Sequence, residues 1–153
     1  MENVYQKLEA LGLSLPQVSA PAANYIPCAI SGSMVFLSGT LPIVDGKPAF
    51  IGKLGENFTI EQGQETARCC VLNLLAHLHH ALDGDLSRVK RVIRLGVFVN
   101  ATPDFTEHPK VANGASDLMM ELFGDAGRHA RFAVGVSGLP FGVAVEVDAT
   151  FEI

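Results

Sequence analysis

Two long stretches of the chain repeat apolar residues at the spacing of an amphipathic helix. The first begins at Thr59, where Thr59-Ile60-Glu61-Gln62 matches a capping box with Thr59 as the N-cap residue. The second runs from Lys110 to Phe123 and is followed by Gly124. The two apolar stripes comprise Ala67, Cys70, Val71, Leu74, Leu75, Leu78, Ala81 and Leu82 in the first helix, and Val111, Ala115, Leu118, Met119, Leu122 and Phe123 in the second. A shorter amphipathic helix is predicted over residues 2–11.

Strand-like alternation of apolar and polar residues occurs in five other segments. Three of these predicted strands lie at Tyr25–Ser31, at residues 34–37 running on into Ser38-Gly39-Thr40, and at Val92–Val99. The last two lie within His129–Ile153 and are joined by a tight turn at residues 139–142, which predicts a terminal hairpin. Between the second strand and the first long helix, residues 42–58 are rich in Gly and Pro, which predicts a long loop.

The predicted order of elements is α-β-β-α-β-α-β-β, which indicates an α+β fold of two layers. The two long helices are expected on one face of a mostly antiparallel sheet, with the short N-terminal helix beside them. No internal repeat or linker interrupts the chain, so residues 1–153 are expected to form a single domain. The other sheet face carries Val, Phe and Gly beside polar residues, and we expect self-association to bury it.

The predicted terminal hairpin places two residues of opposite charge on one face. Its first strand presents Arg131 followed by the small residues Ala133 and Gly135, and its second strand presents Glu146. One interpretation is a cross-strand ion pair, which contributes little when it is exposed. The other gives Arg131 a bidentate grip on a substrate carboxylate and gives Glu146 the task of orienting or deprotonating a water molecule. The spacing leaves both interpretations open.

One glycine interrupts the second predicted helix. Gly114 follows Asn113 at its start, and a glycine inside a helix costs about 1 kcal/mol relative to alanine. Close backbone packing, a ligand and a frayed first turn each explain its presence.

Charge and cysteine content restrict the class of protein. The formal net charge of -5 and the pI of about 5.4 disfavour a general nucleic-acid surface. The three cysteines are Cys28, Cys69 and Cys70, an odd number with two adjacent, which favours reduced thiols over a disulfide framework. No N-terminal signal pattern is present, and no segment reaches the ~18 to 20 apolar residues of a membrane span. We therefore expect a cytoplasmic protein that does not contact the membrane.

Several familiar catalytic motifs do not match. His77, His79 and His80 share one predicted helix, but at ~100° per residue they point in different directions, and no carboxylate stands at zincin spacing. Ser38-Gly39 lacks the flanking glycine of a nucleophile elbow, and no glycine-rich phosphate loop is present. The sequence therefore favours neither a metal site nor an activated serine.

Three segments resemble the RidA/YjgF family of small trimeric proteins, also called the endoribonuclease L-PSP family. Residues 35–42, VFLSGTLP, resemble the apolar-Ser-Gly-Gln-hydrophobic-Pro end of a family strand. Residues 97–99 with Asp104-Phe105 resemble the central strand and the next helix entry. The most specific segment runs from Ala130-Arg131 through Leu139-Pro140 to Val145-Glu146-Val147. The resemblance covers nearly all of the chain after residue 20, and its departures indicate a divergent branch.

This resemblance implies a chorismate-mutase-like fold and a homotrimer with clefts between subunits. The implied reaction is the hydrolysis of reactive enamine or imine acids, such as 2-iminobutanoate, to 2-oxo acids and ammonia, with no cofactor or metal. By resemblance, Arg131 binds the substrate carboxylate and Glu146 is associated with the attacking water. Tyr25 lines the pocket, and the backbone at Ser38-Gly39 lies beside the ligand.

The chain departs from the family pattern inside the implied pocket. Thr40 replaces the usual glutamine, and Ala133 stands where many members have a cysteine. The family's helix asparagine matches either Asn113 or, without a gap, Ser116. Two other functions remain open: a non-catalytic, regulatory module that binds small carboxylates, and ribonuclease activity, which the acidic pI and the lack of a histidine-based acid/base pair disfavour.

Overall fold

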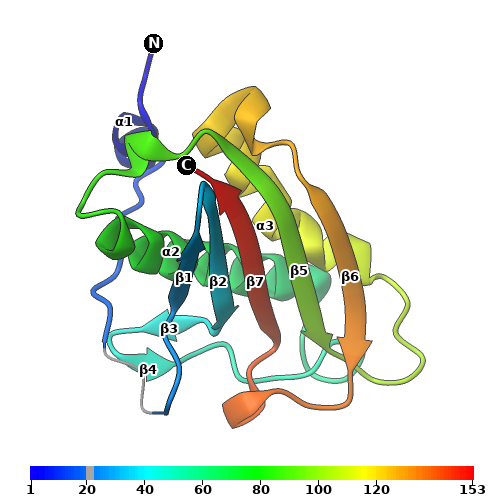
Figure 1. Cartoon of the computed structure of the whole chain (residues 1–153). Helices are drawn as coiled ribbons and strands as arrows, with labels where there is room; N and C mark the ends of the chain where they lie inside the picture. Colours follow the sequence, from blue (N-terminus) through cyan, green and yellow to red (C-terminus); the bar gives the residue numbers. More distant parts are fainter. Residues whose placement is uncertain (20–22) are drawn as a thin grey trace.

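A five-stranded sheet forms one layer of the protein and two long helices form the other (Figure 1). The computed structural model describes residues 1–19 and 23–153. The order across the sheet is β1-β2-β7-β5-β6. These strands are β1 (Cys28–Ser31), β2 (Met34–Thr40), β7 (Val145–Glu152), β5 (Arg91–Asn100) and β6 (Ala130–Val136). Only the β5–β6 pair is parallel, so the predicted mostly antiparallel α+β fold is confirmed.

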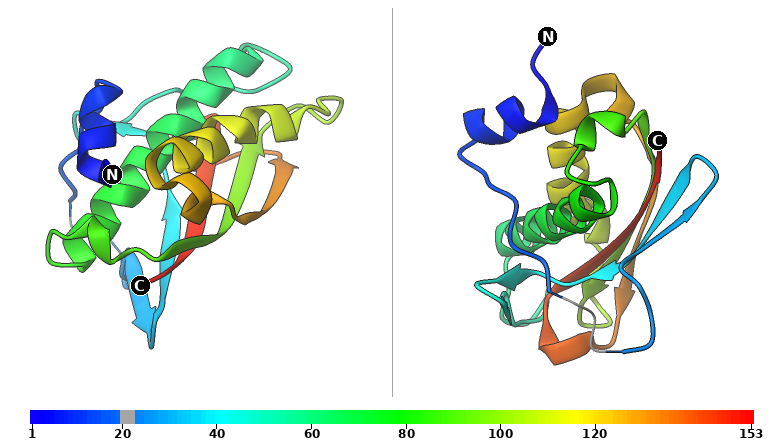
Figure 2. Two further views of the ribbon diagram at one scale, coloured as in Figure 1. Left: turned by 90° about the horizontal axis from the view of Figure 1, so that it is seen from above. Right: turned by 60° about the vertical axis from the view of Figure 1, so that its left-hand side comes forward.

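The helices lie on one side of the sheet, as both views in Figure 2 show. They are α1 (Val4–Ala10), α2 (Ile60–Ala81) and α3 (His108–Phe123). The predicted capping box is present: Gln62 N–H donates to Thr59 Oγ1 at 3.1 Å, and Thr59 N–H donates to Gln62 Oε1 at 2.8 Å. Helix α3 begins two residues earlier than predicted, with Pro109 in its first turn, where proline is tolerated. No helix among the described residues has the length and apolarity to cross a membrane.

The segment predicted as one long loop contains a small hairpin. Strands β3 (Ile43–Val44) and β4 (Lys47–Pro48) pair through Asp45-Gly46, whose φ angles are 52° and 78°. An Asp-Gly pair at positive φ is a characteristic two-residue hairpin turn, so the sequence carried a signal for this element.

The terminal hairpin predicted from the sequence is wrong. Strands β6 and β7 do not pair, because β5 lies between them and bonds to both. Helix α3 returns the chain to the starting end of β5, so β6 runs parallel to β5 on its outer side, as a β-α-β crossover requires. The connection after β6 then crosses beneath β5 before β7 begins (Figure 1).

The two faces of the sheet have different surroundings. The face toward the helices carries the fully buried Val97, Val99 and Val147. On the opposite face, called the open face here, Phe36 and Val134 retain 49% and 42% of their accessible surface. The open face of a single chain is thus partly apolar, as the sequence predicts.

Candidate functional site

Arg131 lies on the edge strand β6 and is held by helix α3. One Nη atom of its guanidinium donates to Asn113 Oδ1 at 2.8 Å and to Ser116 Oγ at 3.1 Å. His129 Nε2 lies 2.9 Å from the same Ser116 hydroxyl. Both residues that the sequence left open as the helix partner therefore contact Arg131, and Asn113 makes the shorter bond.

The Arg131 guanidinium has no acidic partner among the described residues. The arginines that do form ion pairs are Arg68, Arg94 and Arg128. Arg131 instead borders a shallow hollow of about 390 Å³ with Ser116, Met120, Arg128 and His129. A guanidinium that neutral groups orient and no carboxylate neutralises is suited to binding an anion.

Glu146 lies on β7, directly opposite Phe98 of β5. A Cβ atom built on Gly39 would lie 3.1 Å from the Glu146 carboxyl carbon, so the carboxyl group is close to the β2 backbone. Burial raises the pKa of Glu146, and the nearby charge of Asp148 raises it further. A carboxylate of raised pKa is a stronger base than an exposed one.

Within one chain Arg131 and Glu146 do not share a face, so that prediction is wrong. Arg131 pairs with Leu95, which is fully buried toward the helices, whereas Glu146 pairs with Phe98 on the open face. Strand β5 also lies between β6 and β7, and at ~4.8 Å per strand this places the axes of β6 and β7 roughly 10 Å apart. The cross-strand ion pair considered from the sequence is therefore excluded within a single chain.

Four of the other predicted pocket residues gather near β2, whereas Asn113 and Ala133 lie on α3 and β6. Tyr25, Ser38, Gly39 and Thr40 line a cavity of about 250 Å³. The Ser38 hydroxyl donates to Ile26 O at 2.8 Å. The strand register shifts between Leu37 and Thr40, which marks a bulge that re-aims the chain at Ser38-Gly39.

Two polar residues of this cavity were not predicted from the sequence to line it. Asn73 and His77 line it from α2. Asn73 donates to Ile43 O at 3.1 Å, and burial together with the nearby His80 lowers the pKa of His77. Both residues sit at the edge of the apolar stripe of α2, a position that the sequence pattern identifies but to which it assigns no partner.

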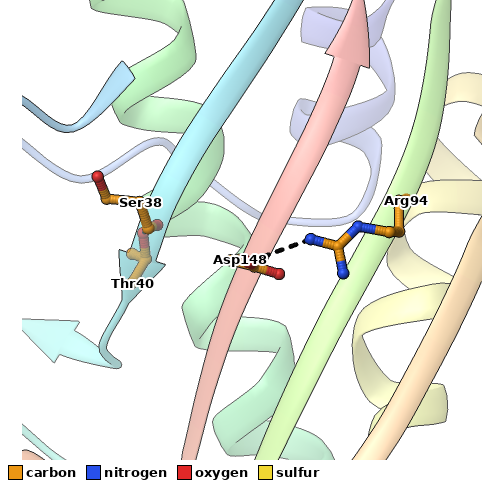
Figure 3. A network of polar contacts seen from close by, with 4 residues as sticks. All are labelled: Ser38, Thr40, Arg94 and Asp148. Atoms are coloured by element: carbon orange, nitrogen blue, oxygen red, sulfur yellow. Dashed lines mark hydrogen bonds and ion pairs between the residues drawn. The ribbon is translucent and has the colours of Figure 1, made fainter. Parts of the chain in front are cut away.

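An ion pair lies next to Glu146 on the open face. Figure 3 shows Arg94 of β5 reaching toward Asp148 of β7, while Ser38 and Thr40 lie along β2. The Arg94 Nη2 to Asp148 Oδ2 distance is 3.3 Å. The other carboxyl oxygen, Asp148 Oδ1, is buried, and no described residue donates a hydrogen bond to it.

The space beside Gly135, one of the small residues of β6, is filled by a neighbouring side chain. A Cβ atom on Gly135 would lie 2.5 Å from His108 Nε2, so the histidine ring occupies that space. Ala133 is partly buried and packs against the core. The small side chains thus accommodate neighbouring groups of the same chain.

The thiols are not activated nucleophiles. All three cysteines are free. Burial raises the pKa of Cys28 and of Cys69 to about 11, and burial raises the pKa of Cys70 as well. They are therefore protonated at neutral pH. The described residues also hold no cluster of three or more His, Cys, Asp or Glu side chains with the geometry of a metal site.

We expect Glu146→Gln to raise the melting temperature at pH 7. A carboxyl whose pKa is raised by folding contributes stability that is present in acid and lost as the pH rises through that raised pKa. Glutamine removes this penalty, so the gain should disappear near about pH 3.5, where the carboxyl is protonated in both states. Thermal melts at both pH values check this, with Glu152→Gln on the same strand as the control. A lower melting temperature for Glu146→Gln at pH 7 would contradict the assignment.

Comparison with known proteins places this fold and these residues in a family. A family model described as "YjgF/chorismate mutase-like, putative endoribonuclease" matches residues 5–148. Protein TCP17 of Trypanosoma cruzi is 51% identical over 152 residues, which span 99% of this chain and 94% of TCP17.

Solved structures agree with this placement. Protein Atu1372 of Agrobacterium tumefaciens, of unknown function, is 44% identical with a TM-score of 0.91, covering 98% of this chain and 93% of its own. A "putative endoribonuclease" of Shewanella oneidensis is 38% identical with a TM-score of 0.95, covering 99% of this chain and 100% of its own. TdcF of E. coli, solved with bound serine, shares the fold at 21% identity and a TM-score of 0.62, covering 90% of this chain and 94% of its own. The chain therefore belongs to the YjgF/chorismate mutase-like family, in a divergent branch together with TCP17.

Proposed function

We propose that the protein hydrolyses reactive 2-imino acids to 2-oxo acids and ammonia, without a cofactor, at sites between copies of the chain in a cytoplasmic homotrimer. Arg131 binds the substrate carboxylate, and Glu146 activates the attacking water. The observation that carries this proposal is the Arg131 guanidinium, which Asn113 and Ser116 orient and which no described carboxylate neutralises. TdcF, which shares the fold, was solved with serine, a ligand that bears a carboxylate.

The chemistry requires one base that can later return its proton. Water attacks C2 of the imine while Glu146 accepts one of its protons, and Glu146 returns this proton to the imine nitrogen to give a neutral carbinolamine. Glu146 then carries the proton of the carbinolamine hydroxyl to the nitrogen, the C–N bond breaks, ammonia leaves and the 2-oxo acid forms. Because burial raises its pKa, Glu146 is a stronger base than an exposed carboxylate, which favours its accepting the proton.

The placement of the two groups supports a site shared between copies. Arg131 lies on the helix side of edge strand β6, whereas Glu146 lies on the open face, adjoining Gly39 of the cavity that Tyr25 and Thr40 also line. When each copy contacts the next through two different surfaces, repeating that contact by rotation can close a ring of subunits. A trimer is one such ring. Burial of Phe36 and Val134, and a donor for Asp148 Oδ1, would favour such an assembly.

Mixed trimers of two inactive variants test the shared site. Arg131→Ala and Glu146→Gln are co-expressed with different tags, and trimers carrying both tags are isolated. If each site takes Arg131 from one copy and Glu146 from the next, every mixed trimer contains a single intact site and has about one third of wild-type activity. Activity is measured as 2-oxo acid formation from imines released by an amino-acid dehydratase or oxidase.

The control is each variant alone, which should be inactive. Inactive mixed trimers would refute the shared site, and failure of the wild-type protein to accelerate hydrolysis of any imino acid would refute the proposed enzymatic activity. Ligand binding that Arg131→Ala abolishes, without turnover, would instead favour the carboxylate-binding module. RNA cleavage that survives rigorous nuclease removal would favour a ribonuclease.

A further inference from the structure

A cavity of about 540 Å³ lies at the end of the parallel strands β5 and β6, where helix α3 begins. Its polar lining comes from Lys53, Glu56, Thr102, His108 and Ser137, and its apolar lining from Ala101, Pro103, Phe105 and Val136. Its volume is within the range of small-molecule sites, about 300–1,000 Å³. Neither Arg131 nor Glu146 lines it.

A lysine ammonium is fixed at this cavity by neutral groups. Lys53 Nζ donates to Asn100 Oδ1 at 2.6 Å and to Ser137 O at 2.8 Å. An ammonium has three N–H groups, so one remains for a further acceptor. No described carboxylate lies within ion-pair distance of Lys53, although the exposed Glu56 borders the cavity.

The amide that holds Lys53 is itself fixed by the fold. Asn100 is 4% exposed, and its Nδ2 donates to Gly52 O at 3.2 Å and to Val143 O at 3.1 Å. Because both amide protons are used by carbonyls, the Oδ1 atom must face Lys53. The ammonium is therefore oriented before any ligand arrives, which lowers the entropic cost of binding one.

His108 is positioned as firmly on another wall. Its ring meets the Phe105 ring edge-to-face at 5.1 Å between centroids, and it lies against the backbone of Gly135. His108 is also the first residue of α3, whose N-terminus has no side-chain cap, so the helix dipole adds partial positive charge at this end. Phe105 supplies an aromatic surface next to these polar groups.

We propose that this cavity, which we call the Lys53 cavity, binds a small carboxylic acid with an apolar body. The carboxylate accepts hydrogen bonds from Lys53 Nζ and from the His108 ring, and the apolar body packs on Phe105 and Val136. Arg131 borders a different hollow near the start of β6. Gly135 and Ser137, which line the Lys53 cavity, lie near the end of β6 and just beyond it. The Lys53 cavity is thus a second ligand site, separate from the proposed imine-hydrolysing site.

Phenylacetate is a suitable probe because it combines a carboxylate with an aromatic ring. Its affinity is measured by calorimetry and its position by amide chemical-shift changes, which we expect near Lys53, Phe105 and Ser137. We expect Lys53→Met to weaken binding at least about tenfold, because a charge-assisted hydrogen bond is lost. Lys47→Met, at an exposed lysine of β4, is the matched control and should leave the affinity unchanged.

Other variants and ligands test the proposal even if Lys53→Met folds poorly. Gly135→Ala leaves Lys53 in place but displaces the His108 ring, whose Nε2 would lie 2.5 Å from the new Cβ atom, and it should also weaken binding. Phenylacetamide, which lacks the charge, and acetate, which lacks the ring, should both bind more weakly than phenylacetate. Arg131→Ala should bind phenylacetate like the wild type, which separates this site from the proposed enzyme site. Equal affinity for phenylacetate and phenylacetamide, equal affinity of wild type and Lys53→Met, or no binding to the wild type would overturn the proposal.

Discussion

Replacing Arg131 with alanine is expected to lower kcat/KM for imino-acid hydrolysis by about two to three orders of magnitude. The guanidinium is oriented by Asn113 and Ser116 before substrate arrives, and its charge has no carboxylate partner among the described residues. Its loss removes a bidentate, charge-assisted contact to the substrate carboxylate and the positioning that this contact provides. Steady-state assays with imines generated in situ measure the effect.

Two further variants separate binding geometry from charge. Arg131→Lys keeps the charge but loses the planar fork, so we expect an intermediate activity. Arg88→Ala, at an exposed arginine elsewhere in the fold, controls for the loss of one positive charge and should behave as the wild type. Activity of Arg131→Ala within about twofold of wild type would remove Arg131 from the substrate site.

The second large effect is expected for Gly114→Ala, which should lower the free energy of unfolding by about 3 kcal/mol. A Cβ atom at Gly114 would collide with the backbone of Gln64, including its carbonyl oxygen and its Cα. Helices α2 and α3 therefore approach each other so closely at this point that no side chain fits, and backbone atoms cannot rotate away. The expected loss is opposite to what helix propensity alone predicts, because alanine stabilises a helix by about 1 kcal/mol relative to glycine.

Gly138→Ala is the matched control for this change. A Cβ atom there meets nothing within 4 Å, so we expect no loss of stability. Denaturant unfolding of all three proteins at one protein concentration provides the comparison, because assembly makes stability depend on concentration. Unchanged or increased stability of Gly114→Ala would show that the two helices can separate at little cost. Of the explanations that the sequence left open for Gly114, close backbone packing is the one that the structure shows.

Local patterns in the sequence determined the elements of this fold. The capping box at Thr59 and the apolar stripes located α2 and α3, because helix starts and amphipathic faces depend on neighbouring residues. The same local reasoning failed for the terminal strands. Adjacent strands in the sequence suggested a hairpin, but the crossover through α3 placed β6 outside β5.

The candidate sites depended more strongly on tertiary structure. The family resemblance pointed to Arg131, Glu146, Tyr25 and the Ser38-Gly39-Thr40 segment as candidate site residues, and all of these except Tyr25 lie in the short segments that carry the resemblance. Only the strand pairing showed that Arg131 and Glu146 lie on opposite faces of the sheet. The two residues therefore do not form the pocket on one hairpin that the sequence suggested. Alternation along a strand fixes which neighbours share a face, but pairing decides which strands adjoin and so which faces coincide.

The Lys53 cavity had no signal in the sequence. Lys53 lies in a segment predicted only as loop, and its partners Asn100 and Ser137 are 47 and 84 residues away. Hydrogen bonds over such separations follow from the packing of the whole domain, which no local pattern encodes. The sequence by itself therefore determined the helices, most strands and the residues of the family motifs. The tertiary structure decided which of those residues meet, because sheet order and long-range packing are properties of the folded chain as a whole.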